Sequence, residues 1–556
     1  MDQGRGLDIS PAMESRSPPE PSVETIEVEA PVVEDSSSSR SKLRISAILT
    51  ALYLSLFVAA LDQTIISTAV PIITFELHSA SGYTWIGGAY ILAKAAAMPI
   101  WAKLSDIWGR KPIILASLLL FFGSSIICAL ARTMPALIAG RALQGIGGGG
   151  LFQLVTITIS DIFSLRHRGL FLGLAEVAWA VAGGVGPVLG GVLAEMVSWR
   201  WIFWLNLPIA GIAFFLTLFF LDVHNPRTHI YDGLRAIDWF GTVTILGFTL
   251  MVLLGLNFGG VVASWSSAKI ICLLVFGVVM SVLFVIIEKR LATYPIMPMM
   301  LFVERSNVAA FITAFTHGFV FIAEEYYLPL YLQSAKLASP TRSGLLILPL
   351  IVTGVITATA TGFLIHRTGE YRQVLQAGMM LTTLGVALFI LLDVSTSTAT
   401  IVGLEILAGV GVGMCFQPPI IAVQAQVPSQ DDVASATATL GFLRNMATAV
   451  SVVVGGVVFQ NGIGLREGTL RSAGLSEGLA RDLTGSEAAA NVELIGLIED
   501  VRQQGVVKDA FAGSTRNMWI LYTSIAACGV IATLFIKRKT LGVEHTETKT
   551  GIKRRV

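Results

Sequence analysis

The feature that most constrains this chain is a series of about fourteen apolar runs, most near twenty residues long, separated by short polar segments. The runs 112–131, 202–221, 344–365 and 518–536 contain no charged residue at all. A helix of about twenty residues spans the hydrocarbon core of a bilayer, roughly 30 Å thick, and satisfies its own backbone hydrogen bonds there. The composition agrees, with 54% hydrophobic and 13% charged residues. The pattern predicts an all-α polytopic membrane protein embedded in the lipid bilayer.

Several other classes are disfavoured by the sequence. The net charge is +1 and no basic stripe is present, so nucleic acid is not an expected partner. The glycine run 147–150 lies inside an apolar run and lacks the Lys-Ser/Thr that ends a phosphate-binding loop. No metal-ligand cluster or nucleophile arrangement is visible. We therefore expect no enzyme, no metal and no cofactor.

The apolar runs define fourteen expected membrane spans. Lys and Arg gather in the short loops on one side, which the positive-inside rule assigns to the cytosol together with both termini. The expected spans are 45–69, 83–101, 112–131, 135–159, 170–197, 201–221, 237–257, 270–287, 308–332, 343–365, 375–392, 398–422, 436–459 and 518–537.

The chain also contains an internal repeat. Gly145, Gly147 and Gly149, followed by Phe152-Gln153, recur 264 residues later as Gly409, Gly411 and Gly413, followed by Phe416-Gln417. Two parallel repeats of six spans are typical of transporters that rock two halves around a central site. Chance similarity between two glycine-rich helices is the alternative, and the matching Phe-Gln pair favours a repeat.

The repeat suggests a division of the chain. Residues 1–44, rich in Pro, Ser and acidic residues, are expected to be disordered. Within the outer loop, Leu494, Leu497, Ile498 and Val501 recur at helical spacing and predict an amphipathic helix. The expected parts are a cytosolic tail 1–44, a six-helix bundle 45–221, a linker with two inserted helices 222–307, a second six-helix bundle 308–540 with outer loop 460–517, and a cytosolic tail 541–556.

Four motifs stand out against this background. One is the short loop 103–112 between the second and third spans. The second is 61–71 in the first span, which contains Asp62, and the third is 141–145 in the fourth span, which begins with Arg141. The fourth motif, in the fifth span, is a run of small residues broken by one proline. Its members are Gly183, Gly186, Pro187, Gly190 and Gly191.

Together these motifs resemble the major facilitator superfamily, specifically its fungal fourteen-span drug:proton antiporter branch. The resemblance covers about residues 45–540 and implies two six-helix bundles with two extra linker helices. In that family the loop 103–112 is a conformational latch, here formed by Asp106, Gly109, Arg110 and Lys111. Ala102 and Ile107 depart from the family's usual glycine and arginine, which implies a weaker latch. The glycine–proline motif of the fifth span implies antiport and export.

Intramembrane charges are the candidate working residues, because an ionisable group at bilayer depth is costly. By resemblance Arg141 belongs to the proton-coupling part of the first bundle. Asp62 is expected to exchange a proton as Arg141 approaches and withdraws, a static buried pair being the alternative. Glu405 occupies the repeat position of Arg141, with Arg444 as the nearest basic candidate to neutralise it.

A second set of residues is expected to line a substrate cavity. Glu176 shares a helix face with Gly183, and Trp179 lies one turn away. Lys94 would either pair with an acid in the cavity or reach the interface. His317 and Glu324, seven residues apart in the ninth span, face the same way. Buried structural roles are the alternative for each.

The sequence thus indicates a monomeric proton-coupled exporter of amphipathic drugs or fungal secondary metabolites, in the plasma membrane or the vacuolar membrane. A carrier of basic amino acids or iron chelates shares this architecture. A non-transporting membrane sensor is the alternative from another class.

Overall fold

The computed structural model describes residues 41–78, 82–260, 263–427, 429–430, 432–484, 488–489, 491–542 and 550–551. Residues 1–40 and most of 541–556, where tails are predicted, lie outside this set. Residues 46–556 form one compact unit. The expected all-α fold is confirmed for the described residues, whose only β feature is an isolated bridge between Gly259 and Ala263.

The helices fall into three consecutive groups. The first contains α1 (Lys42–Ile65), η1 (Ile66–Thr68), α2 (Val70–Glu76), α3 (Gly82–Trp108), α4 (Arg110–Leu130), α5 (Met134–Ile162), α6 (Leu165–Met196) and α7 (Arg200–Phe220). The second contains α8 (Ile230–Arg235), α9 (Trp239–Phe258), α10 (Ala268–Arg290) and η2 (Met299–Phe302). The third contains α11 (Arg305–Ser334), α12 (Pro340–Leu346), α13 (Leu348–Thr368), α14 (Arg372–Leu388), η3 (Phe389–Leu391), α15 (Thr398–Gly413), α16 (Pro418–Gln426), α17 (Asp432–Gly464), α18 (Glu467–Ser472), α19 (Glu477–Asp482), η4 (Val492–Leu497) and α20 (Val501–Leu534).

Each of the fourteen expected spans is largely helical, but 343–365 is divided between α12 and α13, and 398–422 between α15 and α16. Thirteen helical segments of the described residues are long and apolar enough to cross a membrane. The remaining expected span, 83–101, lies in α3, which has Lys94 in its middle and is not one of these thirteen segments. We call residues 46–221 the N-half and residues 308–540 the C-half.

The prediction of an amphipathic helix around residues 494–501 is wrong. Leu494 and Leu497 lie in the short 3-10 helix η4, and Val501 begins α20. The carboxylate of Asp500 accepts hydrogen bonds from the backbone N–H groups of Arg502 and Gln503, so it caps α20 and separates the two elements. Helix α20 therefore begins well before its apolar run, within the segment predicted as an outer loop.

The helices of the two halves pack in the same pattern. In the N-half, α5 packs against α3 and α4, and α4 against α7; in the C-half, α15 packs against α13 and α14, and α14 against α20. A Cβ added at Gly145 would lie 2.3 Å from the carbonyl oxygen of Tyr90, and one at Gly409 would lie 2.4 Å from that of Leu350. Repeat-related glycines thus allow equivalent close helix contacts, which supports the repeat inferred from the sequence.

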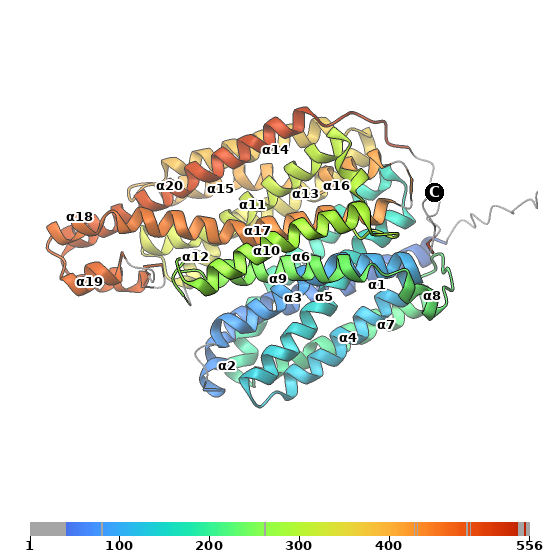
Figure 1. Ribbon diagram of the computed structural model, residues 1–556. Helices are drawn as coiled ribbons and strands as arrows, with labels where there is room; N and C mark the ends of the chain where they lie inside the picture. The colour runs from blue at the N-terminus through green and yellow to red at the C-terminus, as the bar shows by residue number, and fades with distance from the viewer. Residues whose placement is uncertain are drawn as a thin grey trace, which may run out of the picture. The chain divides into compact units, whose positions relative to one another are not determined.

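The inserted helices pack along the boundary between the halves. Helices α9 and α10 pack on each other, and α9 contacts both α3 of the N-half and α17 of the C-half (Figure 1). Lys103 of α3 donates to the carbonyl of Pro295, which lies just after α10. The linker is therefore part of the helical packing as well as a covalent connection.

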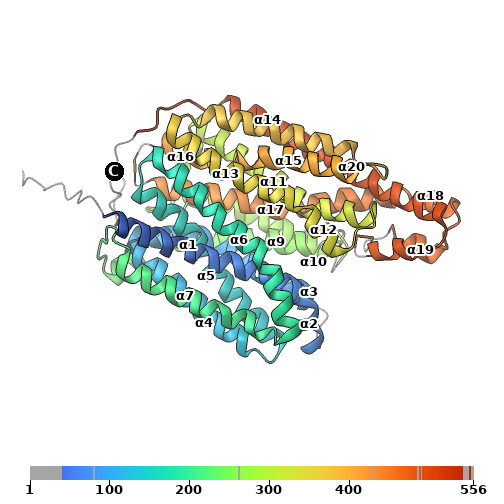
Figure 2. The ribbon, with the colours of Figure 1, turned by 180° about the vertical axis from the view of Figure 1, so that it is seen from behind.

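The two halves meet at the end of the helices that carries the loop 103–112. Gln424 donates to Ser160, and because these residues are 264 apart they are equivalent positions of the repeat. Arg166 donates to the carbonyls of His366 and Arg367. Helices α6 and α13 lie side by side here (Figure 2), with Gly169 and Gly362 in backbone contact. The positive-inside rule predicts that this is the cytosolic end.

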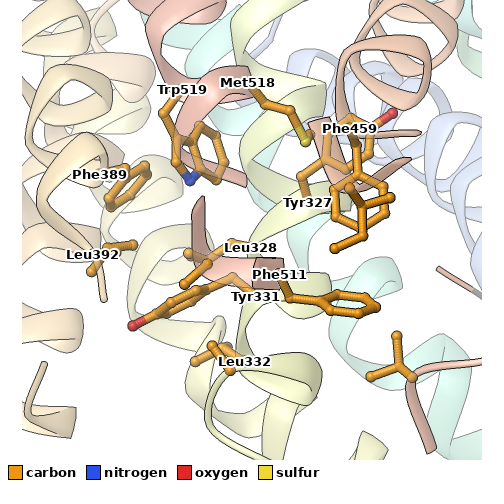
Figure 3. Packing of buried hydrophobic residues seen from close by; sticks show 14 of the residues in the cluster. Tyr327, Leu328, Tyr331, Leu332, Phe389, Leu392, Phe459, Phe511, Met518 and Trp519 are labelled. Carbon is orange, nitrogen blue, oxygen red and sulfur yellow. The ribbon is translucent and has the colours of Figure 1, made fainter. Parts of the chain in front are cut away.

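The opposite end of the C-half is closed by a hydrophobic cluster. Phe389 packs on Trp519 with ring centroids 5.1 Å apart, and Phe459 of α17 packs on Phe511 of α20 at 5.6 Å (Figure 3). Helices α18 and α19 extend from this end (Figure 1), and their Leu470 and Ala480 join the same cluster. The segment between α17 and α20 is therefore anchored by apolar burial.

Candidate functional site

The N-half contains a fully buried ion pair. Arg141 of α5 donates to a carboxylate oxygen of Asp62 at 2.5 Å, and both side chains are at most 1% exposed. Gln144 donates to the other oxygen of Asp62 at 2.9 Å, and Asn206 of α7 donates to it at 2.7 Å. The carboxylate of Asp62 thus accepts three hydrogen bonds, one of them from the charged guanidinium of Arg141, and an ionised form is well compensated.

Local helix geometry builds this network. Arg141 and Gln144 are three residues apart and share one face of α5, so both reach α1. Arg141 also donates to Gln144 and to the carbonyl of Ile86. The guanidinium lies 4.5 Å from the ring centroid of Tyr90, on the stretch of α3 that Gly145 allows to approach. The arginine is therefore fixed from three helices.

Lys94 lies in a different environment. Its ammonium donates to Gln63 at 2.9 Å and lies 3.5 Å from the ring centroid of Phe152 and 5.5 Å from that of Trp179. Phe152 and Trp179 contact each other edge to face, with centroids 5.1 Å apart. These neighbours come from α1, α5 and α6, and they surround the lysine with an amide and two aromatic rings.

The C-half places a second cation over the repeat-related phenylalanine. Arg444 of α17 lies 5.8 Å from the ring centroid of Phe416 and donates to its carbonyl oxygen. It lies close enough to Glu176 and His317 for an electrostatic interaction. The ring of His317 packs edge to face on Phe416 at 4.9 Å, and its Nε2 is 3.1 Å from the carbonyl of Val412. Arg444, expected to neutralise Glu405, is instead associated with Glu176.

Two carboxyl groups of the C-half have no hydrogen-bond partner among the described residues. Glu324 of α11 and Glu405 of α15 are both 0% exposed, and all four of their carboxyl oxygens lack a partner. An ionised carboxylate without a partner in such surroundings costs several kcal/mol or more. Burial without a hydrogen-bond partner therefore favours the neutral, protonated form of both carboxyl groups.

The latch loop contains a buried charge cluster. Gly109 has a φ of 92°, a left-handed conformation that favours glycine, and it separates α3 from α4. Arg110, 1% exposed, pairs with Asp106 at 2.5 Å and with Asp161 of α5 at 2.6 Å. Asp161 was not predicted to belong to the latch. Lys111, which was, lies at the start of α4 and makes no hydrogen bond or ion pair with the described residues. Arg110 carries the basic part of the latch.

The glycine–proline motif of α6 packs partly as expected. A Cβ at Gly186 would lie 2.2 Å from the hydroxyl of Thr64, and one at Gly190 would lie 2.0 Å from the carbonyl of Ile65. Thr68 donates to the carbonyl of Pro187. Gly183 has no atom within 4 Å of such a Cβ, and Gly191 has only the Thr68 hydroxyl, at 4.0 Å. The close contact with α1 and η1 therefore rests on Gly186 and Gly190.

A further ion pair lies near the other end of the N-half. Arg200 pairs with Glu76 at 2.6 Å, and the indole of Trp199 donates to the same carboxylate. The hydrogen bond from Arg200, and then that from Trp199, hold the pKa of Glu76 below its usual range, against partial burial. This gives the Trp199-Arg200 pair a structural role.

The structure brings some predicted residues together and leaves others apart. Asp62 pairs with Arg141, Lys94 contacts Trp179, and Asp106 pairs with Arg110. Glu324 and Glu405 each lie without a partner. The predictions gave no role to Gln144, Asn206 or Ser125, whose hydroxyl accepts from Gln144. The sequence signal that could have identified Gln144 and Asn206 is the presence of an amide side chain at an intramembrane position.

The fold is that of a polytopic membrane protein built from two similarly packed halves. The sequence profile of the Major Facilitator Superfamily matches residues 52–233 and 232–452, so the chain belongs to this superfamily of transporters. This family consists of transporters, in agreement with the prediction that the chain is not an enzyme.

Fungal proteins are similar to the chain over most of its length. The Efflux pump dotC of Dothistroma septosporum is 43% identical over 508 residues, which cover 91% of this chain and 87% of the relative. The MFS-type transporter ppz2 of Metarhizium majus is 43% identical, covering 93% and 89%. The Efflux pump FUS6 of Gibberella moniliformis is 34% identical, covering 93% and 92%. The human organic anion transporter MFSD10 shares the fold, with a TM-score of 0.56 and 15% identity over 88% of this chain and 99% of that chain.

Proposed function

We propose that this protein is a proton-coupled efflux transporter for amphipathic drugs or fungal secondary metabolites, with both termini in the cytosol and the plasma membrane as its location. Export is supported by the 43% identity to the Efflux pump dotC over 91% of the chain. Residues 45–221 and 308–540 would be the two bundles that rock against each other, joined by 222–307.

Proton coupling is supported by the two C-half carboxyl groups without partners. A proton carrier must exist in a neutral and an ionised form during the cycle. Glu324 and Glu405 have the environment of neutral acids in this conformation, whereas Asp62 is compensated as an anion by three donors. We therefore assign the carried proton to Glu324 and Glu405. The pair of Asp62 and Arg141 would hold α1 against α5.

The alternation between faces is supported by the contacts between the halves. The Asp106–Arg110–Asp161 cluster fixes the end of α5 next to Ser160, which accepts from Gln424 of the C-half. Opening this end requires the loss of the Ser160–Gln424 bond and the Arg166 contacts. The latch and the contact surface between the halves therefore adjoin at the neighbouring residues Ser160 and Asp161 of α5.

The test is a flux assay in proteoliposomes with an imposed pH gradient and a panel of lipophilic toxins. Wild type should move panel compounds in the direction opposite to proton flow. Glu405→Gln and Glu324→Gln should each abolish the gradient-driven part. Glu288→Gln, which alters a buried carboxyl of the linker helix α10, is the matched control and should transport normally.

Two results would contradict the proposal. Undiminished gradient-driven transport by the double variant of Glu324 and Glu405 would place the proton elsewhere. Movement of lysine or an iron chelate, with no movement of any lipophilic compound, would replace the exporter by a carrier of the alternative kind.

A further inference from the structure

Lys94 is a buried cation without an acidic partner. Its side chain belongs to a residue that is only 8% exposed, and its contacts are with Gln63, Phe152 and Trp179. No carboxylate of the described residues lies within 4.0 Å of its ammonium. Buried charges in proteins are usually paired, because an uncompensated charge is costly. Lys94 is therefore a buried amine with no counter-charge among the described residues, and an acidic ligand would stabilise its charged form.

The repeat shows that this cation is not required by the packing of the helices. Gly149 of α5 packs against Lys94 of α3, and its repeat mate Gly413 packs against Gly354 of α13. The C-half builds the equivalent contact with glycine and no side chain. The lysine thus adds a charge to a position that the same helix arrangement fills without one.

The surroundings of Lys94 are those of a binding group. Gln63, Phe152 and Trp179 each keep part of their surface exposed, although they converge on one ammonium from three helices. Two aromatic rings in contact supply a large apolar area, and an amide fixes the orientation of the cation. Arg444 lies on the repeat-related Phe416, so both halves combine a cation with a phenylalanine.

We propose that Lys94 binds the carboxylate of an amphipathic organic acid, whose apolar body lies on Phe152 and Trp179. The inference rests on the proposed transport function and names its substrate class. An incoming carboxylate completes the missing ion pair in a site with little water, where a charge-assisted hydrogen bond is strong. Neutral and cationic amphipaths of the same shape lack this contact and bind more weakly.

Binding separates this inference from the transport proposal, since it needs neither a gradient nor turnover. Full-length protein in lipid nanodiscs is titrated with 1-pyrenebutyrate, 1-pyrenebutanol and 1-pyrenebutylamine, which share one apolar body. Wild type should bind the carboxylate about tenfold or more tightly than the alcohol. Lys94→Gln should abolish this preference, Lys94→Arg should keep it, and Lys94→Glu should favour the amine.

Two further variants sharpen the experiment. Gln63→Glu places an internal carboxylate next to Lys94 and should weaken binding of the carboxylate probe alone. Lys269→Gln is the matched control, because this exposed lysine also lies over a phenylalanine, Phe258, but outside the site. Equal binding of the three probes by wild type, or a carboxylate preference that survives Lys94→Gln in protein that elutes and melts like wild type, would overturn the inference.

Discussion

The N-half and the C-half share a helix arrangement but carry different buried charges at the repeat-related positions 141 and 405. At position 141 the N-half has an arginine that completes the coordination of Asp62. At the repeat-related position 405 the C-half has a glutamate with no partner, and Glu324 on α11 has none either. The glycine contacts are conserved between the halves while the charges are not. The repeat therefore preserves the helix contacts while the charged side chains differ between the two halves.

The strongest test of the contrast is a pair of isosteric neutralisations. Asp62→Asn leaves Arg141 buried without its counter-charge and should lower the free energy of unfolding by about 3–5 kcal/mol. Glu405→Gln replaces a neutral acid by a neutral amide and should change it by less than about 1 kcal/mol. Equilibrium unfolding in mixed micelles measures both. Equal losses for the two variants would mean that Glu405 is ionised and paired.

A smaller effect tests the shared scaffold. Gly145→Ala and Gly409→Ala each force a methyl group against a backbone carbonyl, and each should cost about 1–3 kcal/mol. Gly403→Ala on α15 meets no atom within 4 Å and should stabilise by about 0.5–1 kcal/mol through helix propensity. The same unfolding assay applies. If only one of the two repeat-related substitutions destabilises, the halves do not share this contact.

Much of the fold could be predicted because bilayer thickness imposes a length on every apolar run. Helix ends were less predictable, since they depend on capping and on helical segments beyond the apolar run. Asp500 is an example: it lies within the segment 494–501 predicted to be an amphipathic helix, and it is instead the N-cap of a helix that continues to Leu534. A polar side chain at such a position can end one element or begin the next.

The candidate site was predictable residue by residue but not as a set of contacts. Asp62 and Arg141 are conspicuous as intramembrane charges, and each was expected to matter. Asn206 and Asp161 were not assigned roles, because periodicity within one helix does not show which faces of distant helices meet. The same limit explains Arg444, expected beside Glu405 but found near Glu176.

The protonation state of the C-half carboxyl groups is the centre of this account. Infrared spectroscopy of the purified protein in lipid near neutral pH resolves the carbonyl stretch of protonated carboxylic acids from that of carboxylates. We expect the protonated band to lose intensity in Glu324→Gln and again in the double variant with Glu405→Gln. A band of unchanged intensity in the double variant would show that both groups are ionised, and would contradict the assignment of the carried proton to the C-half.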